Sequence, residues 1–133
     1  MQKYLHGLRK CRKSSLLFAQ SKNSLYLCSE MENTLSNIQQ LGKQVIPSGG
    51  HLWLFGSRAR GDYRPDSDWD LLVVLDKDHL TQADYDEVTY PFTELGWTLN
   101  EQINPILYTR KNWEANSFTP FYHNVSEDGI LLQ

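Results

Sequence analysis

Two apolar runs of strand length stand in the first half of the chain, at residues 51–55 and 69–75. Both are rich in leucine, valine and aromatic residues and are bounded by turn-forming residues, so the pattern predicts two buried strands. Before them, apolar side chains recur at the spacing of an amphipathic helix, at Leu35, Ile38, Leu41 and Val45. We expect that helix to begin just after Met31 and to end at the proline- and glycine-containing break at 47–50.

The second half of the chain predicts one longer helix, a third strand and several short elements. Residues 80–95 have helical character, with Gly96 as the stop signal and Pro91 as the point where the helix should kink or divide. Residues 97–108 are a third strand region, in which Pro105 indicates a sheet edge or a bulge. Short elements are expected at 109–113, 118–125 and 130–132. This order predicts an α/β (α+β) fold, a small mixed, twisted sheet with helices mainly on one face.

The length of 133 residues corresponds to one domain. No run approaches the roughly 18 apolar residues of a membrane span, and Cys11 and Cys28 are the only cysteines, so we expect a cytoplasmic protein without membrane contact or a disulfide framework.

Residues 1–30 have six basic side chains and one acidic, and the net charge of −3 therefore leaves −8 for residues 31–133. A body this acidic is a poor general binder of nucleic acid and favours a small substrate or a protein acceptor.

Residues 1–30 differ from the rest of the chain, because they are basic, serine-rich and without a sustained helical or strand period. Our hypothesis is that Met31 is the biological start, that residues 1–30 are upstream translated sequence or a mobile tail, and that the functional domain covers 31–133. A targeting presequence is the alternative, because such segments are also basic, serine-rich and poor in acidic residues.

The candidate chemistry lies between the two predicted strands. Gly56 and Ser57 follow the first apolar run, and after ten intervening residues Asp68 and Asp70 open the second. Side chains at i and i+2 of a strand point the same way, about 7 Å apart, so the two carboxylates can share divalent metal ions. A glycine turn with outward-facing N–H groups can hold phosphate oxygens, and the two features together favour nucleotidyl transfer. A hairpin with an acidic loop is the alternative, but it needs no serine and gains nothing from paired aspartates.

The glycine–serine pair, the spacing and the Asp-x-Asp sequence resemble the signature of the polymerase-beta-type nucleotidyltransferase superfamily. The match is strongest over residues 51–76 and is similar to the small stand-alone members called minimal nucleotidyltransferases. The resemblance implies a palm-like core. It also implies transfer of a nucleoside monophosphate from a nucleoside triphosphate to an acceptor hydroxyl, with ATP as the expected donor and Mg²⁺ or Mn²⁺ as the cofactor.

The same resemblance gives roles to single residues. Asp68 and Asp70 would be catalytic metal ligands, since carboxylate oxygens are the ligands that Mg²⁺ prefers. The nucleotide-binding candidates are Gly56, Ser57, Arg58 and Arg60. The glycine would let the backbone approach the phosphates, the serine would hold terminal phosphate oxygens, and one of the arginines would stabilise the leaving pyrophosphate. The sequence does not say which arginine does so.

Relatives with a complete site carry a third carboxylate on a later strand, as the base for the acceptor hydroxyl. The aligned position here is Asn104, an amide that neither accepts a proton usefully nor binds metal well. Glu101 lies three residues upstream, with the opposite strand parity unless a bulge at Pro105 shifts it. Both Asn104 and Glu101 are therefore candidate catalytic positions.

Stand-alone relatives resemble the antitoxin half of a two-gene module, which implies a small helical HEPN-domain RNase as the partner, adenylylated on a tyrosine. The rival interpretation is a catalytically weak or inactive nucleotide-binding antitoxin or regulatory subunit that acts by contact, and Asn104 favours it. Nucleotidylation of a small molecule is a third interpretation, although such enzymes usually carry an additional helical domain.

Overall fold

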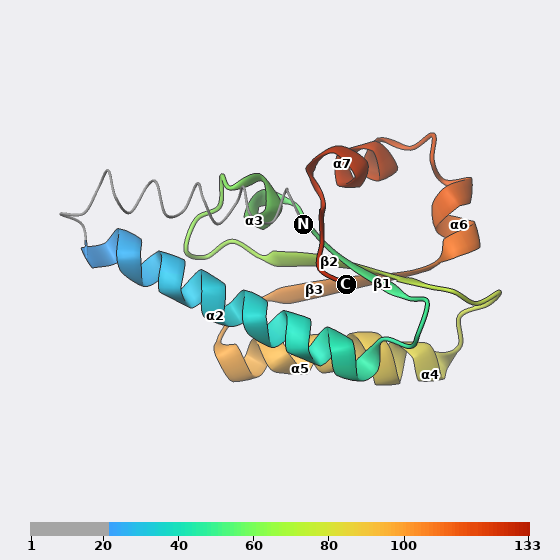
Figure 1. Ribbon diagram of the computed structural model, residues 1–133, viewed down its shortest axis with the longest axis horizontal. Helices are drawn as coiled ribbons and strands as arrows, with labels where there is room; N and C mark the ends of the chain where they lie inside the picture. Colours follow the sequence, from blue (N-terminus) through green and yellow to red (C-terminus); the bar gives the residue numbers. More distant parts are fainter. Residues whose placement is uncertain (1–21) are drawn as a thin grey trace.

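A four-stranded mixed sheet forms the centre of the computed structural model, which describes residues 22–133 and their side chains from Ser29 onward (Figure 1). The strand order is β3-β2-β1-β4, with β1 at His51–Phe55, β2 at Trp69–Leu75, β3 at Ile103–Thr109 and β4 at Ile130–Leu131. β1 pairs antiparallel with β2 and with β4, whereas β2 and β3 run parallel. The predicted mixed sheet is therefore confirmed, and β3 is one of its edges.

The helices lie on both faces of the sheet. The two long ones, α2 (Lys22–Val45) and α5 (Tyr90–Leu99), cover one face, and two short ones, α6 (Arg110–Ala115) and α7 (Pro120–Asp128), lie on the other (Figure 1). The remaining elements are α3 (Ser57–Arg60), α4 (Gln82–Asp84) and a π-helical turn at Tyr85–Thr89. The expectation of helices mainly on one face holds for the long helices. No helix within residues 22–133 has both the length and the apolar character to cross a membrane.

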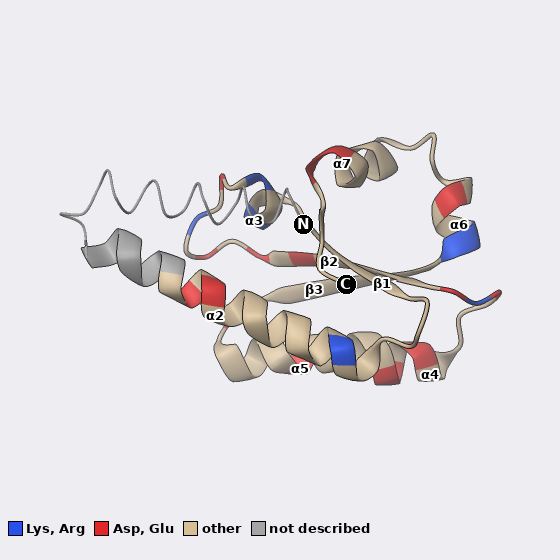
Figure 2. Cartoon of the chain, viewed as in Figure 1, with Lys and Arg blue, Asp and Glu red and all other residues tan. Residues whose placement is uncertain are grey.

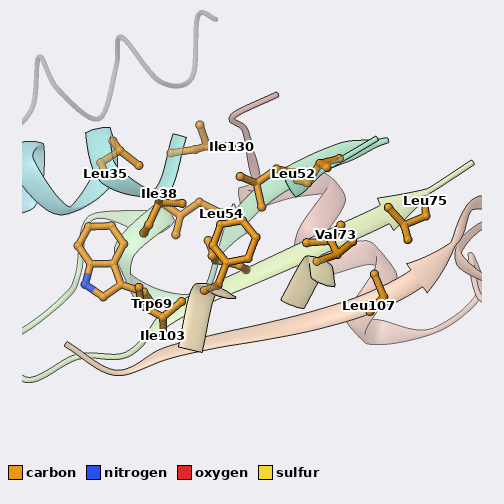
Figure 3. Close-up of a cluster of buried hydrophobic side chains, with 14 residues drawn as sticks. Leu35, Ile38, Leu52, Leu54, Trp69, Val73, Leu75, Ile103, Leu107 and Ile130 are labelled. Atoms are coloured by element: carbon orange, nitrogen blue, oxygen red, sulfur yellow. The ribbon is translucent and has the colours of Figure 1, made fainter. Parts of the chain in front are cut away.

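Alternation along β2 separates the core from the candidate site. Trp69, Leu71, Val73 and Leu75 are buried against the long helices in the main core (Figure 3). Residues of the opposite parity, Leu72 and Val74, pack with Val125 of α7 and a set of aromatic side chains in a second cluster. Because successive side chains of a strand point to opposite faces, Asp70 lies on the side of this second cluster. Trp69, which stands between the two aspartates in sequence, faces the opposite side of the sheet from Asp70.

Two helix boundaries differ from the expectations. α2 begins at Lys22 and continues through Met31, so residue 31 is not the start of the helix. The hypothesis about residues 1–30 falls largely on residues 1–21, which lie outside the described part of the chain, and it stays a prediction.

Gly96 does not end its helix, contrary to the expectation. α5 continues to Leu99 and stops at Asn100, which has the left-handed φ of 54°. Gly96 instead allows close packing, because a Cβ there would lie 2.6 Å from the carbonyl oxygen of Glu101. Trp97 is therefore a helical residue and not the start of the third strand.

Pro91 and Pro105 are accommodated in different ways. Pro91 stands in the first turn of α5, directly after the π-helical turn, so the predicted division of this helix is confirmed. Pro105 lies in the edge strand β3, as expected for a residue without an N–H. The β2–β3 register is continuous from Trp69–Ile103 to Leu75–Thr109, so Pro105 causes no bulge.

Candidate active site

The glycine turn after β1 meets the second aspartate directly. Phe55, the last residue of β1, pairs with Asp70, and Gly56 follows with a φ of +75° that side-chain-bearing residues rarely adopt. A Cβ at Gly56 would collide with Oδ2 of Asp70. The absence of a side chain therefore keeps open the space between the turn and this carboxylate. Ser57 begins the short helix α3 at the same place and is partly exposed.

The parallel pairing of β2 and β3 brings the third predicted position to the aspartates. Asp70 and Asn104 are partners in the register, and the Asn104 side chain donates from Nδ2 to Oδ2 of Asp68 at 3.1 Å. Asp68, Asp70 and Asn104 thus form one cluster, although 34 residues of chain separate the last two. The structure places an amide where the resemblance implies a carboxylate.

Burial raises the pKa of Asp70 above its usual range. The nearby side-chain amide of Asn104 lowers it in part, the negative charge of Asp68 raises it further, and the positive charge of Arg60 lowers it. Acidic and basic residues gather in this region, on α3, the loop that follows it and the start of β2 (Figure 2). The two carboxylates therefore repel each other, and a cation between them would relieve the repulsion.

The donor set fits a hard divalent ion. Within residues 22–133 no group of three or more His, Cys, Asp or Glu side chains is arranged to hold a metal. Two carboxylates suffice for Mg²⁺ when substrate phosphates and water supply the other oxygens. The open space that Gly56 leaves beside Asp70 is where such oxygens have access.

Arg58 is turned into the protein, where it ties down the loop that carries Asp68. Its side chain is only 5% exposed. The guanidinium donates to the carbonyl oxygen of Ser67 at 3.0 Å and to that of Pro65 at 3.3 Å. These bonds fix the residue just before Asp68.

The same guanidinium is held from its other sides by two rings and a carboxylate. It stacks on Tyr63 at 4.6 Å and on Trp69 at 4.7 Å from the ring centroids, and it pairs with Glu101 at 3.8 Å. Burial lowers the pKa of Arg58, and Glu101 raises it most among the neighbouring charges. Arg58 thus has structural partners around its guanidinium and clamps the loop before Asp68.

Glu101 is not placed as a base. It lies two residues before β3, and the bulge that would have turned it toward the aspartates is absent. Its carboxylate faces Arg58 instead. Arg60, in contrast, is exposed, contacts Asp62 at 3.4 Å and acts electrostatically on Asp70. Of the two arginines, Arg60 is the one accessible to a ligand.

The sequence profile of the nucleotidyltransferase domain family matches residues 31–120. The chain belongs to this family. It is also 37% identical over 79 residues to a protein of Methanocaldococcus jannaschii that is named as a candidate protein adenylyltransferase, with 59% of this chain and 73% of that protein covered. This nucleotidyltransferase is therefore an enzyme of the class that transfers nucleotidyl groups.

One solved structure agrees in fold with the nucleotidyltransferase described here. A toxin–antitoxin crystal structure with AMP-PNP has a TM-score of 0.55 at 22% identity, covering 74% of this chain and 72% of that one. A Sulfolobus solfataricus protein described as a candidate nucleotidyltransferase has a TM-score of 0.46 at 18% identity, covering 79% and 84% of the two chains. The first of these likenesses supports the shared fold.

The clamp around Arg58 was not foreseen from the sequence. The rings of Tyr63 and Trp69 enclose its guanidinium, and both residues lie close to Arg58 in sequence. These two aromatic residues were the feature of the sequence from which a buried arginine could have been predicted. Glu101 lies 43 positions from Arg58, so its part in the clamp depends on tertiary structure.

Proposed function

We propose that this nucleotidyltransferase moves AMP from ATP to a hydroxyl group of a partner protein and releases pyrophosphate. The observation that carries the proposal is the convergence of Gly56, Asp68, Asp70 and Asn104 at one end of the sheet. A phosphate-accessible turn beside two carboxylates is the minimum that metal-assisted nucleotidyl transfer requires.

Each residue near the turn has a task in this reaction. Gly56 and Ser57 would bind the phosphates, Asp68 and Asp70 would hold Mg²⁺ or Mn²⁺, and Arg60 would face the negative charge of the pyrophosphate. When bound, the divalent ion would offset charge on the triphosphate and on the leaving group. The acceptor oxygen forms a bond to the α-phosphorus, the bond from that phosphorus to the oxygen bridging to the β-phosphorus breaks, and the hydroxyl proton passes to solvent.

Asn104 favours an acceptor that needs little help in losing its proton. An amide cannot act as a general base, and Glu101 is engaged with Arg58. A phenol, with an ordinary pKa of about 10, ionises far more readily than an aliphatic hydroxyl. Tyrosine is therefore the acceptor side chain that best suits this site.

A toxin partner is supported by the structural neighbour described as a toxin–antitoxin with AMP-PNP and by the protein adenylyltransferase name of the archaeal relative. We propose that the partner is a small helical HEPN-domain protein, so that this chain acts as the antitoxin. The acidic character of residues 31–133 suits a protein acceptor better than a nucleic acid.

The test is incubation of the protein with α-labelled ATP, Mg²⁺ and a small helical HEPN-domain protein from the same genome, followed by mass spectrometry of that partner. We expect a mass gain of one AMP on a tyrosine, lost in the Asp70→Asn variant. A partner that stays unlabelled under Mg²⁺ and Mn²⁺, although it binds this chain, would contradict the catalytic proposal.

A second candidate function rests on Asn104 alone. An amide at the third position suits a protein that keeps the nucleotide pocket but neutralises its partner by contact. In that case Asp70→Asn would leave neutralisation of the partner intact, whereas the catalytic proposal requires neutralisation to be lost.

A further inference from the structure

A cavity of about 540 Å³ opens at the outer edge of β3. Its walls are the end of α5, the turn at 100–102 and the start of β3. Asn104 lines this cavity and also bonds to Asp68, so one side chain is shared by the cavity and the candidate active site. The end of α5 and the start of β3 lie at the same end of the molecule as α3 (Figure 1).

The cavity reaches around the edge of the sheet. Ile103 belongs to the core side and Asn104 to the side of the aspartates, yet both line it. Two of its lining residues are held close together, because Gly96 lets α5 approach the backbone of Glu101, whose N–H donates to the Gly96 carbonyl at 2.8 Å. An extended molecule lying in it would run from α5 toward Asp68.

Trp97 forms an exposed aromatic wall of the cavity. Its side chain is 68% exposed, although tryptophan is among the residues that gain most from burial. It packs edge-on against Tyr90 at 6.1 Å, and Tyr90 is itself exposed, so the two rings form an aromatic strip on the solvent side of α5. Tryptophan and tyrosine are the residues that most often anchor protein partners.

The chemistry of the walls argues against a phosphate-bearing occupant. Among the residues that line the cavity in the described part of the chain, Glu101 alone is charged, and it is paired with Arg58. No lysine or arginine is present to meet phosphates, as nucleotide and nucleic-acid sites require. Asn100, Gln102 and Asn104 supply side-chain amides, which both donate and accept and so match the main chain of a peptide.

We infer that this cavity is the docking site for the acceptor, and that its occupant is a polypeptide segment with an apolar side chain seated on Trp97. The inference rests on the proposed function, because it assigns the acceptor half of the same site. The phosphates of the donor are held on the side of Gly56, and the peptide approaches from the side of Asn104. The acceptor hydroxyl then arrives beside Asp68 and Asp70 without crossing the nucleotide.

The test uses a defined probe and two matched variants. The probe is an acetylated, amidated pentapeptide with tyrosine at its centre, leucine on each side and glycine at both ends. It is titrated into the protein with Mg²⁺ and AMP-PNP while the indole N–H resonances are followed by NMR. Trp97→Ala removes the proposed anchor, and Phe118→Ala removes another exposed aromatic ring, 84% exposed and just ahead of α7, as the control.

We expect the peptide to shift the Trp97 resonance, and Trp97→Ala to raise the Kd for the peptide at least about tenfold while Phe118→Ala leaves it unchanged. The Kd for AMP-PNP should be the same in all three proteins. The inference would be overturned if the peptide did not bind, or if Trp97→Ala left its affinity unchanged. It would also be overturned if the single-stranded oligonucleotide tetrathymidylate, and not the peptide, shifted the Trp97 resonance.

A separate measurement keeps the proposed function apart from the docking site. Labelled ATP is added with the same peptide to the wild type and to Trp97→Ala, and AMP transfer is measured in both. Transfer that does not depend on Trp97 would support the proposed function and overturn the docking site. Peptide binding through Trp97 without transfer would support the docking site and count against the catalytic proposal.

Discussion

The side-chain amide of Asn104 on β3 donates to a carboxylate oxygen of Asp68, the residue just before β2, at 3.1 Å. The bond lowers the cost of holding Asp68 close to Asp70, because a donor faces a negative charge where a third carboxylate would add repulsion. Asn104 thus stabilises the ligand-free protein. In return, the site lacks the general base that a carboxylate at this position would provide.

Asn104→Asp should have opposite effects on stability and activity. A carboxylate within hydrogen-bonding distance of Asp68 adds like charge, so the metal-free variant should melt at a lower temperature than the wild type. With Mg²⁺ and ATP, a positioned base should raise the transfer rate by about 10²–10⁴-fold. Melting curves in chelator and labelled-ATP rates test both effects, and Asn104→Ala is the control. A rate unchanged by the new carboxylate would mean that the acceptor hydroxyl does not pass this residue.

Asp70→Asn should stabilise the metal-free protein in a pH-dependent way. The folded pKa of Asp70 is raised, so stability falls as the pH rises from the unfolded pKa to the folded pKa, and the cost is absent where the carboxyl is protonated in both states. The variant should therefore be more stable than the wild type at neutral pH, and the two should converge below the usual range of aspartate pKa values. Urea melts in chelator at several pH values measure the difference. The exposed Asp62→Asn is the control, and a variant less stable than the wild type at neutral pH would show that Asp70 has a structural partner.

Gly56→Ala should remove the stabilisation by ATP. A methyl group there collides with Asp70, and the φ of +75° adds strain. The wild type should gain about 2.7 kcal/mol at a ligand concentration 100-fold above Kd, and Ser57→Ala should weaken this gain by removing one hydroxyl. Thermal shifts with Mg²⁺ and ATP give the comparison. A wild type that responds to no nucleoside triphosphate with either metal would refute the pocket.

Substitutions of Arg58 and Arg60 should differ in their effects, the first on stability and the second on ligand binding. Arg58→Met removes charged hydrogen bonds to Ser67 and Pro65 and should cost about 2–3 kcal/mol of unfolding free energy. Arg60→Met, at an exposed site, should change stability by less than about 0.5 kcal/mol but weaken ATP binding. Denaturant melts and ATP titrations on both variants check the contrast. Equal losses of stability would mean that the clamp is not the role of Arg58.

Glu101→Gln distinguishes a clamp residue from a base. The substitution keeps the shape but removes the charge that faces Arg58. We expect lower stability with the rate of transfer at saturating ATP and acceptor retained, because the Glu101 carboxylate is engaged with Arg58. The pH profile of that transfer rate is the decisive measurement. If Glu101 were the base, the substitution would abolish the increase of the rate with pH, whereas loss of an ion pair would leave that increase in place.

The local part of the site followed from the sequence. The apolar runs 51–55 and 69–75 became β1 and β2 without change, and the period of two along β2 placed Trp69 in the core and Asp70 on the other face. Gly56 stood where the turn needed a residue without a side chain. Such features depend on neighbours within a few residues, so the backbone period and the turn chemistry determine them.

The non-local part was decided only by the tertiary structure. The register between β2 and β3 placed Asn104 beside Asp70 and left Glu101 to pair with Arg58. Close packing at Gly96 carried α5 on to Leu99, and this put Trp97 on a helix beside the site. Strand register and helix length depend on side chains far away in sequence that meet only after folding, so no spacing within the chain encodes them by itself.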